Sequence, residues 1–434
     1  MLKLVLGASG SGKTTLLYAR IRARAEAGKR SILLVPEQFT SSTEARIYRE
    51  LGDALSGMVE SYSFTSLAEH ILAIEGGAAV QTLTDAGRAV LVRRALEELQ
   101  DNVHYYYRHR RSAAFCQMAA ETIDELKSAG LSGQQLQELA RDCGTESAKL
   151  GELALIFQGY ESLLAGTGMD PADRLELAAD RLEAALARDE LPDFLREREV
   201  FIDEFDTFNA PKKRLMGAML AALPAVTVAL CEDGAPMQPG DLELFSGAKQ
   251  VAAQLRQLAR KNGAQVAAPE LLRRDLRHKD APGLAALTEL LETGSCTPPE
   301  SAPELRLFAA ASREEEARCA AAAIRRLMRQ GVRCGKIAVV CRDISLYRAA
   351  VRYEFRMAEI PLYCDEPTTP EFSAPATAVR ALLALLRGAD MTEQLTVLAK
   401  TGLCDLTEPE VCALENYAYT WSPNAAAWRA EFTK

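Results

Sequence analysis

A glycine-rich segment near the start of the chain has the residues of a phosphate-binding loop. It matches the pattern Gly-x-x-x-x-Gly-Lys-[Ser/Thr] and reads Gly7-Ala8-Ser9-Gly10-Ser11-Gly12-Lys13-Thr14. The glycines let backbone N–H groups turn toward phosphate oxygens, and the next helix adds its positive end. Lys13 would reach the β- and γ-phosphates of ATP, and Thr14, followed by Thr15, would place its hydroxyl on Mg²⁺. The alternative, a turn that binds nothing, gives no reason for Lys and Thr at this spacing.

A second motif lies where the apolar run Val200-Phe201-Ile202 ends in Asp203 and Glu204. In a P-loop protein, the first acid at such a strand end holds Mg²⁺ through water, and the second polarises the attacking water. We assign these roles to Asp203 and Glu204. Apolar residues followed by acids are a weak signal alone. They gain weight here because both motifs would end strands of one sheet.

Two polar loops also follow apolar segments. Residues 32–35 lead into Pro36-Glu37-Gln38-Phe39-Thr40, and a predicted strand at about 58–61 leads into Ser63. Parallel sheets bind ligands at the carboxyl ends of their strands, so Gln38, Thr40 and Ser63 are candidate ligand contacts. Simple helix capping is the alternative for all three residues.

The elements that must position these motifs predict an α/β fold. Short, wholly apolar strands are typical of a parallel sheet with helices on both faces, here a P-loop NTPase (RecA-like) sheet in residues 1–295. From about 82 to 195, leucines and alanines recur at helical spacing and strand patterns disappear. This change predicts a helical insertion within the first domain.

A proline-rich stretch from Thr297 to Pro303 precedes a second, incomplete RecA-like α/β domain, predicted at 304–434 with a helical C-terminal segment. Its predicted strands are 305–309, 337–341 and 361–364, and its predicted helices include 312–330 and 344–357. Arg342 follows the second of these strands. It could face a nucleotide held between the domains, or it could be a surface charge at a helix start.

The helical insertion contains one segment in which basic and aromatic residues alternate. It reads His104-Tyr105-Tyr106-Tyr107-Arg108-His109-Arg110-Arg111. Such a segment could stack bases and neutralise phosphates. The alternative is a solvated helix end with tyrosines packed beneath it.

Composition limits the function classes. The net charge of −9 and pI near 5.3 argue against a surface that coats polyanions, so any nucleic acid must bind locally. The ten cysteines show no C-x-x-C pair and no zinc-finger spacing with the four histidines. We therefore expect reduced thiols and no zinc or iron–sulfur site. Neither a membrane span nor a signal peptide is visible, which predicts a cytoplasmic protein without a membrane partner.

Together these motifs resemble a known family. The glycine-rich loop, Val35-Pro36-Glu37-Gln38, Ser63-Phe64, Ile202-Asp203-Glu204-Phe205 and residues 337–342 are similar to the superfamily 1 helicase-like part of AddB, the B subunit of the bacterial ATP-dependent helicase/nuclease. Val-Pro-Glu-Gln is the more particular signal, because many families share the phosphate loop. Segments 115–127 and 153–160 also resemble the AddB helical insertion.

The resemblance implies a subunit that joins an A subunit and processes DNA ends for recombinational repair, with Gln38, Thr40 and Ser63 contacting single-stranded DNA. In that family the nuclease and an iron–sulfur cluster lie in a long C-terminal part. Neither they nor the later helicase motifs can be placed on these residues, so no iron–sulfur cluster is expected here. The family glutamine that reads adenine is also absent, which predicts loose base selectivity.

Two other function classes remain open from the sequence. One is a DNA-scanning module that binds ATP structurally without hydrolysing it. The other is a free-standing P-loop ATPase or kinase, against which the second α/β unit speaks. An ATPase assay with and without single-stranded DNA would discriminate among them.

Overall fold

A computed structural model describes residues 1–77, 79–99, 102–109, 111–236, 244–364 and 372–432. The chain divides into two compact units, Met1–Leu305 and Arg306–Lys434. Among the described residues, no helix is long and apolar enough to cross a membrane.

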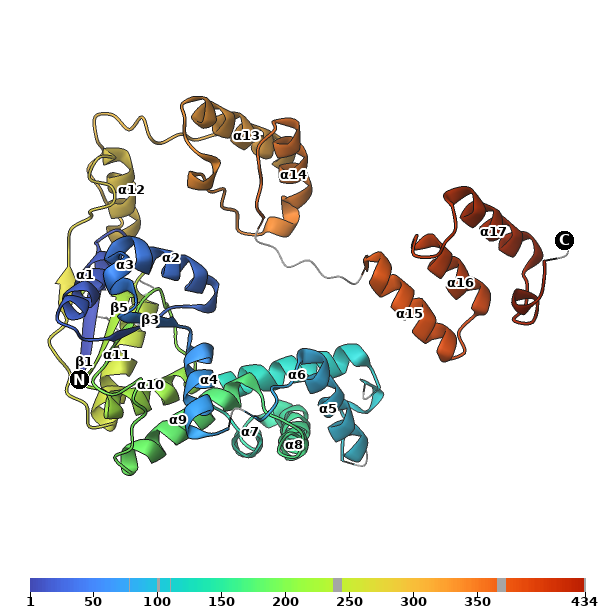
Figure 1. Ribbon diagram of the computed structural model, residues 1–434, viewed down its shortest axis with the longest axis horizontal. Helices are drawn as coiled ribbons and strands as arrows, with labels where there is room; N and C mark the ends of the chain where they lie inside the picture. The colour runs from blue at the N-terminus through green and yellow to red at the C-terminus, as the bar shows by residue number, and fades with distance from the viewer. Residues whose placement is uncertain (78, 100–101, 110, 237–243, 365–371, 433–434) are drawn as a thin grey trace. The chain divides into compact units, whose positions relative to one another are not determined.

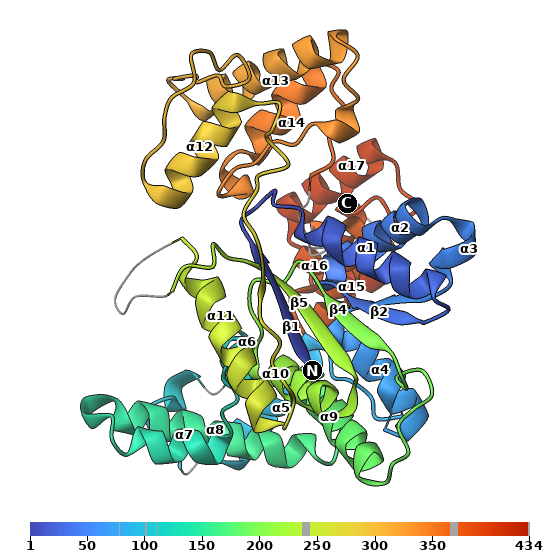
Figure 2. The ribbon, with the colours of Figure 1, turned by 90° about the vertical axis from the view of Figure 1, so that its left-hand side faces the viewer.

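The first unit is built on a parallel sheet of six strands in the order β3-β2-β4-β5-β1-β6 (Figure 2). The strands are β1 (Leu2–Gly7), β2 (Ser31–Leu34), β3 (Val59–Tyr62), β4 (Glu199–Ile202), β5 (Ala225–Cys231) and β6 (Glu270–Leu272). All five neighbouring pairs are parallel. The predicted α/β fold is confirmed. The three-residue edge strand β6 was missed, because so short an apolar run before a basic stretch carries little strand signal.

Helices cover both faces of this sheet, as its apolar strands require. One face packs against α1 (Lys13–Glu26) and α2 (Thr40–Leu51), with the short α3 (Asp53–Ser56) beside them. The other face packs against α4 (Phe64–Glu75), α9 (Pro171–Ala187), α10 (Ala210–Ala222) and α11 (Ser246–Lys261). Side chains of β1 alternate between the two cores, with Leu4 on one side and Val5 on the other. The helix α12 (Pro282–Thr293) ends the unit.

The predicted helical insertion lies between β3 and β4 and is confirmed. It contains α5 (Asp85–Glu98), α6 (Ala113–Ser128), α7 (Gly133–Ala140) and α8 (Ser147–Leu164), and α9 returns the chain to the sheet. These helices enclose an apolar core of their own, which includes Phe115, Phe157 and Tyr160. Figure 1 shows α6 extending from the region of α5 back toward the sheet.

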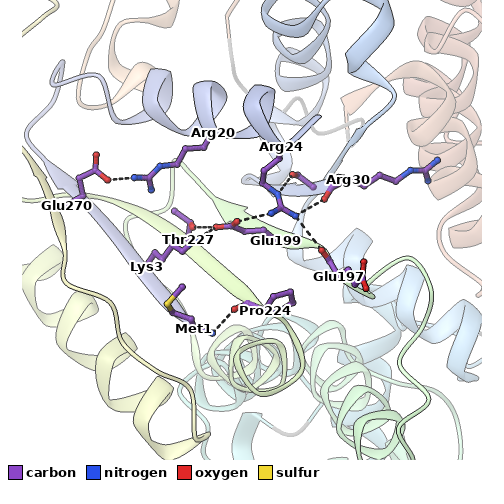
Figure 3. Close-up of polar contacts among 11 residues, drawn as sticks. Met1, Lys3, Arg20, Arg24, Arg30, Glu197, Glu199, Pro224, Thr227 and Glu270 are labelled. Carbon is purple, nitrogen blue, oxygen red and sulfur yellow. Dashed lines mark hydrogen bonds and ion pairs between the residues drawn. The ribbon is translucent and has the colours of Figure 1, made fainter. Parts of the chain in front are cut away.

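A charge network lies at the amino ends of the central strands (Figure 3). The buried carboxylate of Glu199, at the start of β4, accepts hydrogen bonds from Lys3 Nζ (2.8 Å) and Thr227 Oγ1 (2.9 Å). It also pairs with Arg24 of α1 at 3.3 Å. The network therefore ties β1, β4, β5 and the end of α1 together at the edge opposite the phosphate-binding loop.

The second unit is helical in its described residues. It contains α13 (Arg313–Arg329), α14 (Arg348–Met357), α15 (Ala374–Leu386), α16 (Met391–Lys400) and α17 (Glu408–Trp421). The strands predicted at 305–309, 337–341 and 361–364 are not formed there. Among the described residues their backbones have no strand neighbour, and the side chains of Leu307, Val340 and Tyr363 are 98%, 90% and 87% exposed. An apolar pattern makes a strand only where a neighbouring strand accepts its hydrogen bonds.

Candidate nucleotide site and adjoining groove

The phosphate-binding loop joins β1 to α1 at the carboxyl edge of the sheet. Gly10 and Gly12 have positive φ angles of 81° and 91°, which L-residues rarely adopt. A Cβ on Gly7 would lie 2.4 Å from Ser11 Oγ, and one on Gly10 would lie 2.8 Å from the Cβ of Arg277. The glycines predicted from the motif are therefore required by backbone conformation and by space.

Lys13 begins α1 and turns back over the loop. Its Nζ donates hydrogen bonds to the carbonyl oxygens of Gly7 (2.7 Å) and Ala8 (2.8 Å). Burial lowers the pKa of Lys13, while the nearby Cys231 and Asp203 act in the opposite direction. Within the described residues the ammonium forms no ion pair, so its charge is available to an anion in the loop.

Asp203 and Glu204 lie just beyond β4. The N–H of Asp203 donates to Leu34 O at 3.1 Å, which fixes the acid at the end of the neighbouring β2. Asp203 Oδ1 in turn accepts the N–H of Glu204 at 3.0 Å. Glu204 has a φ of 64°, a conformation that costs a non-glycine residue roughly 1–2 kcal/mol. Burial and the charge of Asp203 raise the pKa of Glu204, which strengthens its carboxylate as a proton acceptor.

A segment after β6 lies across the phosphate-binding loop. Leu276 N donates to Gly10 O (3.0 Å), and Arg277 Nη1 donates to Ser9 Oγ (3.1 Å). Asp275 Oδ1 accepts the N–H groups of Arg277 (2.9 Å) and His278 (3.1 Å), which fixes this turn. The sequence did not reveal Arg277 as a site residue, because the loop and this turn are far apart in the chain.

These groups line one cavity of about 560 Å³. Its wall includes Lys13, Thr14, Thr15, Asp203, Glu204, Cys231, Arg277 and Arg46 of α2. The Arg46 guanidinium lies 4.9 Å from the centre of the Tyr18 ring. Sequence reasoning missed Arg46 as well, because an arginine inside an amphipathic helix carries no motif.

The cavity fits a magnesium nucleotide. Ser11 Oγ is buried without a hydrogen-bond partner, and the three loop glycines leave space that a side chain would fill. Thr14 and Asp203 both line the cavity. Magnesium is held by few protein ligands when phosphates and waters complete its shell. The described residues contain no group of three or more His, Cys, Asp or Glu side chains placed to hold a metal ion.

A second hollow, which we call the groove, adjoins the cavity and has a volume of about 510 Å³. Its wall includes Gln38, Ser63, Phe64 and Thr65 from the sheet edge, and Asp124, Ser128 and Pro171 from α6 and α9. Glu204, Phe205 and Asp206 line both the groove and the cavity. Its charged side chains are Lys212 and the four acids Glu37, Asp124, Glu204 and Asp206.

Lys212 lies among aromatic rings at this groove. Its Nζ is 5.8 Å and 5.5 Å from the ring centres of Phe64 and Phe205. The ring of Phe205 stacks on that of Phe208, with centres 5.3 Å apart. These rings are almost fully buried, with Phe64 2% and Phe205 9% exposed, so the groove offers little ring surface and one ammonium rather than a row of cations.

The three candidate polar contacts differ in their surroundings. Ser63 is buried and caps α4, because its Oγ accepts the N–H of Ser66 at 3.1 Å. Thr40 Oγ1 donates to Glu37 O at 3.0 Å, a local turn contact. Gln38 is exposed in the groove and has no side-chain hydrogen bond to any described residue. The capping alternative is confirmed for Ser63, and Gln38 stays a predicted ligand contact.

The remaining predicted residues lie elsewhere. Arg342 is exposed and belongs to the second unit, so its predicted contact with a nucleotide stays a prediction. The basic–aromatic segment is a loop with a short 3₁₀ turn (Tyr107–His109) rather than a helix end. Arg110 lies outside the described residues.

Comparison with known proteins gives consistent matches. A family model described as "ADDB, N-terminal" matches residues 4–288. The chain is 32% identical over 444 residues to the B subunit of the ATP-dependent helicase/deoxyribonuclease of Desulforudis audaxviator, covering 98% of this chain and 37% of that protein. Proteins of the same name from Moorella thermoacetica and Symbiobacterium thermophilum are 31% and 30% identical, over 99% of this chain and 38% of theirs. The chain thus spans less than two fifths of the length of these relatives.

Proposed function

The chain belongs to the family of ADDB N-terminal regions, and from this membership and its geometry we propose that it is the ATP-binding, DNA-contacting part of a helicase/nuclease B subunit. The observation that carries the proposal is the single cavity in which the phosphate loop, Lys13, Thr14 and Asp203 meet. The relatives are named as B subunits of a helicase/deoxyribonuclease, which supports an A subunit as partner and DNA as substrate. In the proposal that substrate is a DNA double-strand end, processed for recombinational repair. The ten free thiols support a cytoplasmic site of action.

In this proposal the phosphate-binding loop and the α1 amino end hold the phosphates of ATP. Lys13 and Arg277 would supply positive charges, and Thr14 and Asp203 would hold Mg²⁺, whose charge would offset that of the phosphates. Glu204 orients a water and accepts its proton. We expect slow hydrolysis, since arginines that complete such sites contribute roughly a thousandfold or more, and the later helicase motifs were not found in these residues.

The groove would take single-stranded DNA. The exposed polar side chains of Gln38, Thr65 and Thr207 can contact bases, while four carboxylates against one ammonium disfavour a run of phosphates. The shared wall of Glu204, Phe205 and Asp206 gives nucleotide and DNA a common border. The binding of either would then act on the other through this strained turn.

Anisotropy titrations with a labelled single strand test this role. Gln38→Ala, with Thr40→Ala, should weaken DNA binding and leave nucleotide binding intact, with the larger share coming from Gln38. Gln250→Ala, an exposed glutamine on α11 away from the groove, is the matched control and should change neither. Unchanged DNA affinity in the double variant would remove the groove from the DNA path.

A structural ATP-binding role is the second candidate. In this role the phosphate loop, Lys13 and Thr14 would bind ATP in the same cavity, but Glu204 would not activate a water. Turnover that single-stranded DNA stimulates and that Glu204→Gln abolishes would exclude this candidate.

A further inference from the structure

The charge balance of the groove raises the question of where this chain would hold a DNA backbone. The groove wall carries one lysine and four carboxylates, and the chain as a whole has a net charge of −9. Neutralising phosphates requires unpaired cations, because backbone contacts dominate DNA affinity. Such cations must therefore lie outside the groove.

The loop between α5 and α6 presents unpaired cations in the described part of the chain. Arg108 and Arg111 are exposed and form no ion pair with any described residue. In contrast, on α5 the guanidinium of Arg93 pairs with Glu97 (3.1 Å), and that of Arg94 pairs with Glu98 (3.3 Å). The two loop arginines thus keep their full charge for an external anion.

A buried carboxylate holds this loop in place. Glu152 of α8 accepts the backbone N–H groups of His104 (2.8 Å), Tyr105 (2.7 Å) and Tyr106 (3.1 Å). The ring of Tyr106 packs against Phe115 with centres 5.0 Å apart, inside the helical core. The backbone of residues 104–106, which precedes Arg108, is therefore anchored to the helical core.

The outward side chains all suit phosphate contacts. Tyr105 is 59% exposed. The neighbouring residues His104, before Tyr105, and His109, after Arg108, are also exposed. The amino end of the 16-residue α6, capped by Ser112, lies next to Arg111 and adds the positive end of a helix dipole. Arginine, tyrosine and helix amino ends are common donors to DNA phosphates.

The distance between the loop and the groove favours a duplex over a single strand as the DNA that contacts the loop. α6 joins them, because Asp124 and Ser128 near its carboxyl end line the groove and its amino end carries the loop. Its length is about 24 Å at 1.5 Å per residue, equal to about 7 base pairs of duplex. The exposed Glu121 and Glu125 lie between, and they would repel a flexible strand lying along the helix. A stiff duplex can span that distance without following the helix surface.

We propose that the loop around Arg108 and Arg111 is a second DNA contact, which binds the phosphate backbone of the duplex whose single-stranded tail enters the groove. This inference rests on the proposed function, because it takes the groove as the place of the single strand. It adds a duplex contact on the helical insertion, about one helix length away.

Anisotropy titrations of the 434-residue chain with a tailed hairpin duplex, and with the tail alone, test the proposal. Arg108→Gln with Arg111→Gln should weaken binding of the tailed duplex roughly ten- to a hundredfold at about 0.1 M salt, and lower the slope of log K against log salt by about 1.8. Binding of the tail alone should not change. Arg93→Gln with Arg94→Gln removes the same charge from paired positions and should leave both affinities unchanged.

Three results would overturn the proposal. These are an equal loss on both DNAs, an equal loss in the control variant, or a wild type that binds the tailed duplex no more tightly than the tail. The third result leaves the proposed function standing if the tail still binds. A wild type that binds neither DNA would contradict the proposed function together with this inference.

Discussion

In the parallel sheet of the first unit, buried charge is paired at the amino ends of the strands (the amino edge), whereas Lys13 and Glu204 at their carboxyl ends (the carboxyl edge) form no ion pair with any described residue. At the amino edge, Glu199 is buried and fully engaged by Lys3, Arg24 and Thr227 (Figure 3). At the carboxyl edge, the partners of Lys13 among the described residues are two backbone carbonyls, Ser11 Oγ has no hydrogen-bond partner there, and Glu204 has a left-handed backbone conformation. Satisfied groups stabilise a fold, while unsatisfied and strained groups mark a place where a ligand completes the structure. The amino ends of the strands thus carry groups that stabilise the fold, and their carboxyl ends carry the groups to which we assign the ligand.

Breaking the amino edge should cost the most stability. Glu199→Ala leaves two cations without their buried partner, and breaking a buried pair costs about 3–5 kcal/mol. We expect the lower end of that range, because Lys3 and Arg24 keep some solvent access. The midpoint of urea unfolding measures the loss. Glu270→Ala, which removes a partly exposed partner of Arg20, is the control and should cost under about 1 kcal/mol.

The same carboxylate predicts a pH dependence. Burial raises the pKa of Glu199, but the hydrogen bonds from Lys3 and Thr227 and the charges of Lys3 and Arg24 outweigh it, so the folded pKa is lowered. Its stabilisation is therefore fully present above the pKa of the unfolded chain and is lost as the pH falls through the folded value. Urea unfolding of the wild type below about pH 5 should show this loss, and Glu199→Gln should reduce it. An identical acid slope in wild type and variant would show that Glu199 is not the responsible group.

At the carboxyl edge, by contrast, removing a side chain should raise the stability of the fold. Glu204→Gly removes a side chain from a left-handed backbone position and should stabilise the chain by about 1 kcal/mol, despite the flexibility that glycine adds to the unfolded state. ATP turnover should be lost in the same variant. Glu197→Gly, at a φ of 60° outside the site, is a matched control that should stabilise without affecting nucleotide. Destabilisation by Glu204→Gly alone would mean that its side chain supports the fold.

The sequence predicted those parts of the site that are local in the chain. The phosphate loop and Asp203-Glu204 were recognised because each motif is contiguous and ends a buried strand. Arg277 and Arg46 were not, because they reach the cavity through tertiary packing, Arg277 from the segment after β6 and Arg46 from α2. The role of Glu199 was equally invisible, since its partners come from three other elements.

The second unit shows the limit of pattern reasoning for the fold. Its helices α13 and α14 lie where helical periodicity predicted them, with α14 starting at Arg348 rather than near 344. Helices satisfy their hydrogen bonds locally, so their pattern is sufficient. The apolar segments at 337–341 and 361–364 lack partner strands among the described residues, and no local pattern can supply one.

The most direct test of this account is thermal unfolding of the chain with and without millimolar Mg-ATP. Wild type should be stabilised, because a ligand that binds only the folded state raises its stability. Lys13→Ala should abolish that stabilisation while changing the ligand-free stability by under about 1 kcal/mol, because the cost of burying the ammonium offsets its two hydrogen bonds to loop carbonyls. Lys29→Ala, an exposed lysine outside the site, should behave as wild type. No stabilisation of wild type, or equal stabilisation of Lys13→Ala, would contradict the assignment of the carboxyl edge as a nucleotide site.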